Sequence, residues 1–148
     1  MEDVHNKKII VGTSMLLDML QDGDSINIAI SGGSMLPFIV EETDRIMLVR
    51  ANLDSLKKGD IVVAQVQNDV YFLHRIVRIS KEEVVLRGDG NLYSKETCHI
   101  SSVLAKAVAI DKGGKVYTSH SLLWKAMARF WPANPVLRRI ALAIYRRM

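Results

Sequence analysis

Apolar and polar positions alternate at short intervals through most of the chain. Ile26, Ile28 and Ile30 alternate with less apolar neighbours, which predicts a strand over 25–31. The same pattern predicts further strands at 45–50, 61–66, 70–79, 84–86, 103–110 and 116–118. Turn-forming residues separate these segments. Many short strands at roughly even spacing predict a mainly β fold, a curled antiparallel sheet or small barrel.

Helical periodicity replaces this alternation at the two ends of the chain. From Ile9 to Leu20 apolar residues recur at helical spacing, which predicts an N-terminal amphipathic helix ending near Gln21. After residue 118, two short amphipathic helices are predicted on either side of the Pro-containing stretch 131–135. Their apolar faces hold Leu122, Leu123, Ala126 and Phe130, and then Val136, Ile140, Ala143 and Ile144. We therefore divide the chain into a β domain with its N-terminal helix, 1–118, and a helical tail, 119–148.

Composition fits a folded domain without an evident cofactor. The chain has 148 residues, enough for one domain, and its 49% hydrophobic and 24% charged content excludes general disorder. Its one cysteine, Cys98, allows no internal disulfide, and no cysteine cluster suggests zinc. We expect neither a metal nor an organic cofactor.

Charge is concentrated in the tail. Residues 119–148 contain six Lys and Arg and no Asp or Glu, so the net charge of +4 divides into +6 for the tail and −2 for the rest. Such a tail suits anionic lipid, nucleic acid or an acidic partner. Nucleic acid is not expected, because no known binding motif appears.

The aromatic residues of the tail have two interpretations. Trp124, Phe130, Trp131 and Tyr145, interleaved with basic residues, suit the surface of an anionic membrane, or they pack against the body. No run of about 18 apolar residues and no secretory signal are visible. We therefore expect a cytoplasmic protein, which on the first interpretation contacts the inner face of the membrane through its tail and on the second does not.

Three polar residues are candidates for chemistry. Ser34 follows Gly32 and Gly33 in a predicted turn, where its hydroxyl either caps the backbone or projects as a nucleophile. His74 lies in an apolar strand and is either a core histidine or a general base. Asp89, in a Gly-rich loop, is either a turn residue or the acceptor for the second ring N–H of His74. Each pattern alone leaves both readings open.

Together these residues resemble a family. Ser34-Met35-Leu36-Pro37, Lys58-Gly59-Asp60-Ile61-Val62, His74-Arg75-Ile76-Val77 and Gly88-Asp89-Gly90-Asn91 are similar to the successive conserved boxes of signal peptidase I-like serine peptidases. The similarity covers about residues 24–110. The resemblance implies a β-rich fold with Ser34 as nucleophile, His74 as base and Asp89 as third partner. The histidine resembles the endoplasmic-reticulum and archaeal branch, since bacterial members have lysine there.

The sequence departs from the family pattern in three places. No transmembrane anchor precedes the serine box, and Gly32 stands where bacterial members have a serine that helps to hold the oxyanion. The oxyanion hole would then consist of backbone N–H groups, those of Ser34 and Gly32. The loop after Asn91 lacks a further family aspartate, for which Glu96 is the nearest acidic substitute. Repressor-type autopeptidases are related in fold, but they use a lysine base and carry a DNA-binding domain.

Two functional hypotheses follow. The first is a serine endopeptidase that cleaves a leader or signal-type peptide through an acyl-enzyme on Ser34. The second is a peptidase-fold protein that is weakly active or inactive and binds a peptide or protein partner. The first requires Ser34 Oγ to lie within roughly 4 Å of a ring nitrogen of His74.

Overall fold

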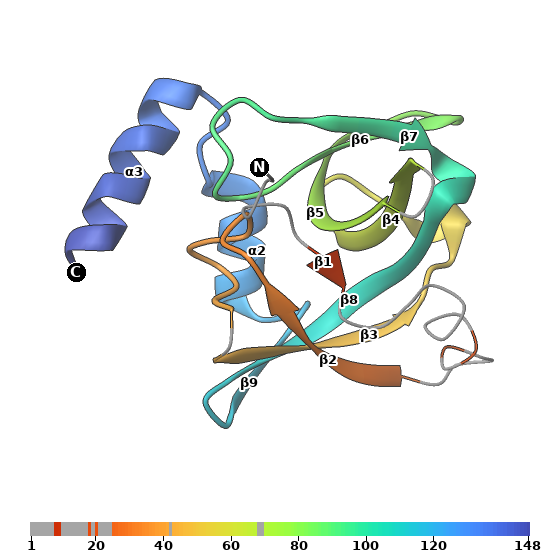
Figure 1. Cartoon of the computed structure of the whole chain (residues 1–148), viewed down its shortest axis with the longest axis horizontal. Coiled ribbons are helices and arrows are strands. Elements are labelled where there is room, and N and C mark those ends of the chain that lie inside the picture. The colour runs from red at the N-terminus through yellow and green to blue at the C-terminus, as the bar shows by residue number, and fades with distance from the viewer. Residues whose placement is uncertain (1–7, 10–17, 19, 21–24, 42, 68–69) are drawn as a thin grey trace.

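One curled antiparallel sheet dominates the computed structural model (Figure 1), which describes residues 8–9, 18, 20, 25–41, 43–67 and 70–148. Within these residues the strands are β1 (Lys8–Ile9), β2 (Ser25–Ser31), β3 (Asp44–Arg50), β4 (Ile61–Gln67), β5 (Val70–Ile79), β6 (Glu83–Arg87), β7 (Glu96–His99), β8 (Val103–Lys112) and β9 (Lys115–Thr118). Their spatial order is β1-β2-β3-β8-β4-β5-β6-β7, and β9 pairs with β8 beside this path. Two 3-10 turns, η1 (Leu53–Ser55) and η2 (Ile100–Ser102), connect strands.

The sheet is curled, so that strands far apart in this order approach each other. β1 pairs with β2 at one end of the order and also contacts β5 near the other end. Irregular registers in β3, β4 and β5 accompany the curvature, as β-bulges do elsewhere. The predicted mainly β, curled antiparallel fold is confirmed.

Apolar side chains are buried on both faces of the central strands. In β4, Ile61 and Val63 belong to one core cluster, whereas Val62 and Ala64 belong to a second. This follows from strand geometry, because successive side chains point to opposite faces. It explains why 61–64 is a continuous apolar run rather than an alternating one.

Two helices follow the sheet. α2 (Leu122–Phe130) is capped by Ser121, whose hydroxyl accepts from the Trp124 N–H, and α3 (Pro135–Arg147) is capped by Asn134. Trp124 is buried in the larger core cluster, where its ring meets Phe38 edge-to-face with centroids 5.3 Å apart. The predicted tail helices are confirmed, while the division of the chain at residue 118 stays a prediction.

The predicted strands all form, with bounds that shift by up to two residues. β1 and β7 were not predicted: β7 is only four residues long and mostly polar, so it carries little periodic signal. Most of the predicted N-terminal helix lies outside the described residues. Its first residue, Ile9, is in β1 and pairs with Ile30, so the helix prediction is wrong at that position.

Candidate active site

Ser34 lies in the tight turn that follows β2. The turn begins at Gly32, whose φ of 91° is a backbone conformation that favours glycine. The buried side chains of Met35, Phe38 and Ile39 anchor the turn in the core. Ser34 is only 3% exposed, and its Oγ lies 3.1 Å from Nε2 of His74. The predicted approach of these two side chains is confirmed.

The ring of His74 is held on three sides. It is 1% exposed and stacks on Phe72 with ring centroids 5.1 Å apart. While Nε2 faces Ser34, Nδ1 lies 2.6 Å from Oε1 of Glu96, a half-buried carboxylate at the start of β7. A carboxylate on Nδ1 favours the tautomer that carries its proton there, which leaves Nε2 as an acceptor. Ser34, His74 and Glu96 thus form a continuous hydrogen-bonded row.

The register of the sheet explains why Glu96 reaches His74. Ile76 in β5 pairs with Leu86 in β6, and Leu86 pairs with Glu96 in β7. Directly paired residues share a face of the sheet, and so do residues two apart in one strand. His74, two residues before Ile76, therefore lies on the same face as Glu96.

Asp89 belongs to the opposite face, so the prediction that it accepts from His74 is wrong. Its carboxylate accepts two hydrogen bonds from Arg75, 2.8 Å from Nε and 2.7 Å from Nη2. Arg75 pairs with Arg87 across β5 and β6, and Asp89 follows Arg87 by two residues. Because Arg75 and His74 are adjacent in the strand, their side chains point to opposite faces. Both members of the Arg75–Asp89 ion pair are buried.

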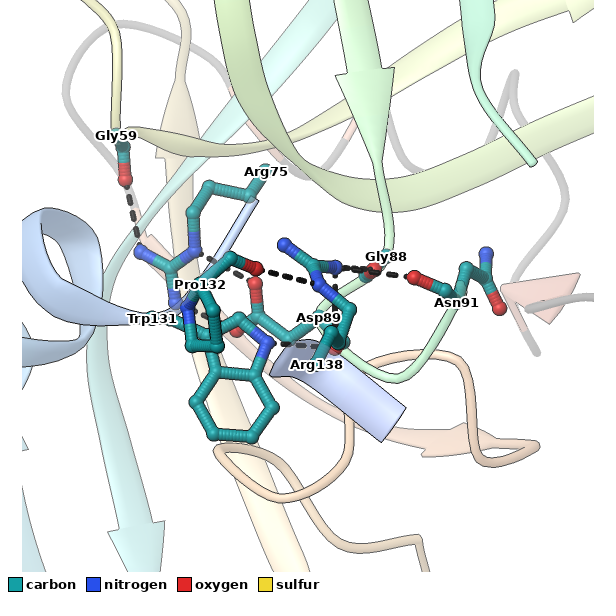
Figure 2. A network of polar contacts seen from close by, with 8 residues as sticks. All are labelled: Gly59, Arg75, Gly88, Asp89, Asn91, Trp131, Pro132 and Arg138. Carbon is teal, nitrogen blue, oxygen red and sulfur yellow. Dashed lines mark hydrogen bonds and ion pairs between the residues drawn. The ribbon is translucent and has the colours of Figure 1, made fainter. Parts of the chain in front are cut away.

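Arg75 connects several of the sequence motifs on the face of the sheet opposite His74. Its Nη1 donates to the Gly59 carbonyl at 3.0 Å, and its guanidinium lies 5.2 Å from the centroid of the Phe38 ring. The Gly59 N–H in turn donates to the Ile76 carbonyl. Arg75 therefore links the strand β5 to Phe38, to Gly59 and to Asp89, and Figure 2 shows its contacts with Gly59 and Asp89.

The Gly-rich loop packs against the backbone of the turn that holds Ser34. The Gly90 N–H donates to the Ser34 carbonyl at 2.8 Å. A Cβ on Gly90 would lie 2.6 Å from the Gly33 carbonyl oxygen, and one on Gly88 would overlap the Ser34 carbonyl. Both positions therefore require glycine because two backbones meet there. The loop positions Ser34 through the main chain and not through the Asp89 side chain.

Comparison with known proteins agrees with this arrangement. The family model described as Peptidase S24-like matches residues 2–110. The chain belongs to the Peptidase S24-like family. The matched region contains Ser34, His74, Asp89 and Glu96, and the resemblance to S24- and signal peptidase-like serine peptidases is confirmed. No curated protein and no solved structure matches the chain.

In this Peptidase S24-like protein, residues of the tail contact the loop that packs against the Ser34 turn. Nη1 of Arg138 on α3 donates to the carbonyls of Gly88, Asp89 and Asn91 at 2.9 to 3.2 Å, and its Nε donates to Pro132 (Figure 2). Nε1 of Trp131 donates to the Asp89 carbonyl at 2.7 Å. These contacts hold the whole loop that supports Ser34.

Three guanidinium groups gather around Asp89. Arg87 donates to the carbonyls of Asn91, Leu92 and Ala133, close to Arg138. Burial, with a smaller contribution from Arg87, lowers the pKa of Arg138 to about 10. Asp89 acts in the other direction on both arginines, so its charge compensates this buried cationic cluster.

A cleft of about 690 Å³ opens in front of Ser34. Its walls come from the turn that holds Ser34, the segment 90–96 and α3, which contributes Arg146. At its rim a Glu41 carboxylate oxygen accepts the Gly32 N–H at 2.9 Å. A substrate oxygen would have to displace Glu41 to use that donor. The assignment of the Ser34 and Gly32 N–H groups to an oxyanion hole stays a prediction.

Glu96 also affects its neighbour Cys98. Burial, and secondly the Glu96 carboxylate, raise the pKa of the Cys98 thiol. This thiol is therefore not an activated nucleophile. Among the described residues, no group of three or more His, Cys, Asp or Glu side chains is arranged to hold a metal ion.

Proposed function

We propose that this protein is a serine endopeptidase with Ser34 as nucleophile, His74 as general base and Glu96 as the residue that orients the histidine. The observation that carries the proposal is the hydrogen-bonded row from Ser34 Oγ through the two nitrogens of His74 to Glu96. It supplies a nucleophile, a base within hydrogen-bond reach and a group that fixes the base. Membership of the Peptidase S24-like family supports the same chemistry.

Acylation begins with attack of Ser34 Oγ on the carbonyl carbon of the scissile peptide bond. The Oγ–C bond forms as the hydroxyl proton passes to His74 Nε2, and Glu96 stabilises the resulting imidazolium through Nδ1. The tetrahedral intermediate then collapses, the C–N bond breaks, and His74 returns the proton to the leaving amine. The products are an acyl-enzyme on Ser34 and a free amine.

Deacylation repeats these steps with water. His74 takes a proton from the water as its oxygen attacks the ester carbon, and returns it to Ser34 Oγ when the ester bond breaks. The developing oxyanion in both halves requires donors, for which the Ser34 backbone N–H is the first candidate. Near-complete burial of His74 strengthens its interactions with both partners, because little water screens them.

The substrate we propose is a leader or signal-type peptide with small side chains just before the scissile bond, as the family resemblance implies. The cleft in front of Ser34 is in the size range of binding pockets, and the small residues Gly33, Gly90 and Ser94 form part of its wall. Such walls leave room for peptide backbone close to the nucleophile.

A binding protein without turnover is the second candidate. The contact between Glu41 and the Gly32 N–H favours it, because a carboxylate occupies a position beside the nucleophile where a substrate oxygen would bind. On this alternative, peptides bind in the cleft and leave intact.

Incubation with a library of leader-bearing peptides, followed by mass spectrometry, tests the proposal. We expect cleavage products from the wild-type chain and none from Ser34→Ala or His74→Ala, with the double variant little worse than either single one. Ser55→Ala, which changes an exposed hydroxyl on η1, is the matched control and should cleave normally. Peptides retained without cleavage by the wild-type chain would establish the binding alternative, and full activity of Ser34→Ala would exclude this nucleophile.

A further inference from the structure

α3 has two faces of different character. Its inner face holds Arg138 and Leu142, 4% and 3% exposed, against the body of the protein. Its outer face is apolar but exposed: Val136, Leu137, Ile140 and Ile144 retain 51 to 63% of their surface. Figure 1 shows α3 at the edge of the molecule, with no other element beyond it. We call these four residues the outer stripe.

The outer stripe lies beside positive charge. On a helix with 3.6 residues per turn, Arg139 and Arg146 lie along one edge of the outer stripe, and Arg147 lies at its C-terminal end. α2 repeats the pattern, because Leu122 and Phe130 are 86% and 75% exposed and lie near Lys125 and Arg129. The segment 119–148 contains no acidic residue to offset this charge.

The structure changes which residues of the tail are available for contact. Trp124 is buried in the core, and Trp131 donates its indole N–H to the loop beside the active site. Arg138 is buried as well. The two tryptophans therefore pack on the body, and the exposed groups are aliphatic side chains, Phe130 and five of the six basic residues.

We propose that the outer stripe of α3, assisted by the exposed face of α2, binds the surface of an anionic lipid bilayer. A helix with an aliphatic face and arginines beside it lies in the membrane interface, with the apolar side chains among the acyl chains and the guanidinium groups at the headgroups. The absence of acidic residues in 119–148 gives charge complementarity to anionic lipid. No described helix is long and apolar enough to cross a bilayer, so the contact is peripheral.

The contact has a consequence for the active site. The inner face of the same helix holds the Gly88–Asn91 loop through Arg138, and Arg146 lines the cleft. A bilayer on the outer stripe would place the cleft close to lipid. Peptides that are themselves associated with the membrane would then be presented at high local concentration.

Co-sedimentation with vesicles tests the proposal, using the full chain carrying Ser34→Ala so that turnover plays no part. We expect binding to mixed phosphatidylglycerol and phosphatidylcholine vesicles, little binding to phosphatidylcholine alone, and weaker binding at higher salt. Arg139→Gln with Arg147→Gln should weaken binding by about 25-fold, since each charge near the surface contributes roughly fivefold. Ile140→Ser with Ile144→Ser should weaken it at least about tenfold.

Matched substitutions on the body serve as controls. Val116→Ser with Leu53→Ser removes exposed apolar groups, and Lys81→Gln with Lys115→Gln removes exposed charges, without touching the tail. These variants should bind vesicles as the parent does, and all variants should keep its melting temperature. Equal loss in the control variants, or equal binding to neutral vesicles, would overturn the proposal. So would light scattering that shows the outer stripe holding two copies of the chain together without any lipid binding. A failure here would leave the peptidase proposal intact, because cleavage of free peptides is measured separately.

Discussion

Asp89 and Glu96 offer a direct test of how the site is built. Both are candidates for the acidic residue beside Ser34 and His74, but the structure pairs Asp89 with Arg75 and Glu96 with His74. Asp89→Asn removes the negative member of the buried Arg75–Asp89 pair and leaves Arg75, Arg87 and Arg138 close together without a compensating charge. Breaking a buried ion pair from one side costs about 3 to 5 kcal/mol. For a chain of 148 residues this corresponds to a fall in melting temperature of roughly 6 to 20 °C.

Glu96→Gln has the opposite signature. The half-buried amide replaces a half-buried carboxylate of equal size, so the free energy of unfolding should change by less than about 1.5 kcal/mol. The amide, however, can donate to Nδ1 of His74, and that favours the tautomer in which Nε2 already carries a proton. Such a histidine cannot accept the Ser34 proton, and kcat should fall by about two to four orders of magnitude.

The assay combines thermal unfolding of each variant with cleavage of the same peptide well below its melting temperature. Asp54→Asn, at an exposed carboxylate on η1, is the isosteric control and should change neither quantity. The reasoning is refuted if Asp89→Asn keeps the melting temperature and loses kcat, while Glu96→Gln retains full activity. That result would make Asp89 the partner of His74 in the working enzyme.

Three further predictions concern the neighbourhood of the site. Arg138→Met should lower the melting temperature by roughly 6 to 12 °C, because about 3 kcal/mol is lost when the loop carbonyls lose their donor, and calorimetry measures it. Gly90→Ala places a Cβ 2.6 Å from the Gly33 carbonyl oxygen, so it should lower the free energy of unfolding by about 1 to 3 kcal/mol and displace Ser34. Denaturant titration and peptide cleavage measure the two effects, and an unchanged result in both would contradict the prediction. The raised pKa of Cys98 leaves less thiolate at pH 8. Iodoacetamide should therefore alkylate Cys98 several times more slowly than it alkylates free glutathione, and the rate at Cys98 should increase as the pH rises. Glu96→Gln should partly restore that rate, as followed by mass spectrometry.

The sequence alone determined the type of fold and much of its order. The β pattern over 25–31 and 70–79 agrees with the observed strands to the residue, because strand length and alternation are local properties that burial imposes on the chain. The sequence also predicted the tail helices, because a proline at a helix start and apolar residues at helical spacing are signals that depend only on neighbouring residues. The order of the boxes around Ser34 and His74 identified the kind of protein, which Peptidase S24-like membership confirms.

The partners of those residues were decided only by the tertiary structure. Asp89 lies closer than Glu96 to His74 in sequence, yet the register of β5, β6 and β7 places Glu96 on the face of His74 and Asp89 on that of Arg75. A shift of one residue would exchange these faces, and β7 is too short and too polar for its hydrophobic pattern to fix that register. The interpretation of the tail was decided in the same way. From the composition of the tail, Trp124, Trp131 and Arg138 could all have contacted a membrane. In the structure they pack against the core and the Gly88–Asn91 loop instead. Burial depends on contacts between distant segments, and those exist only once the chain has folded.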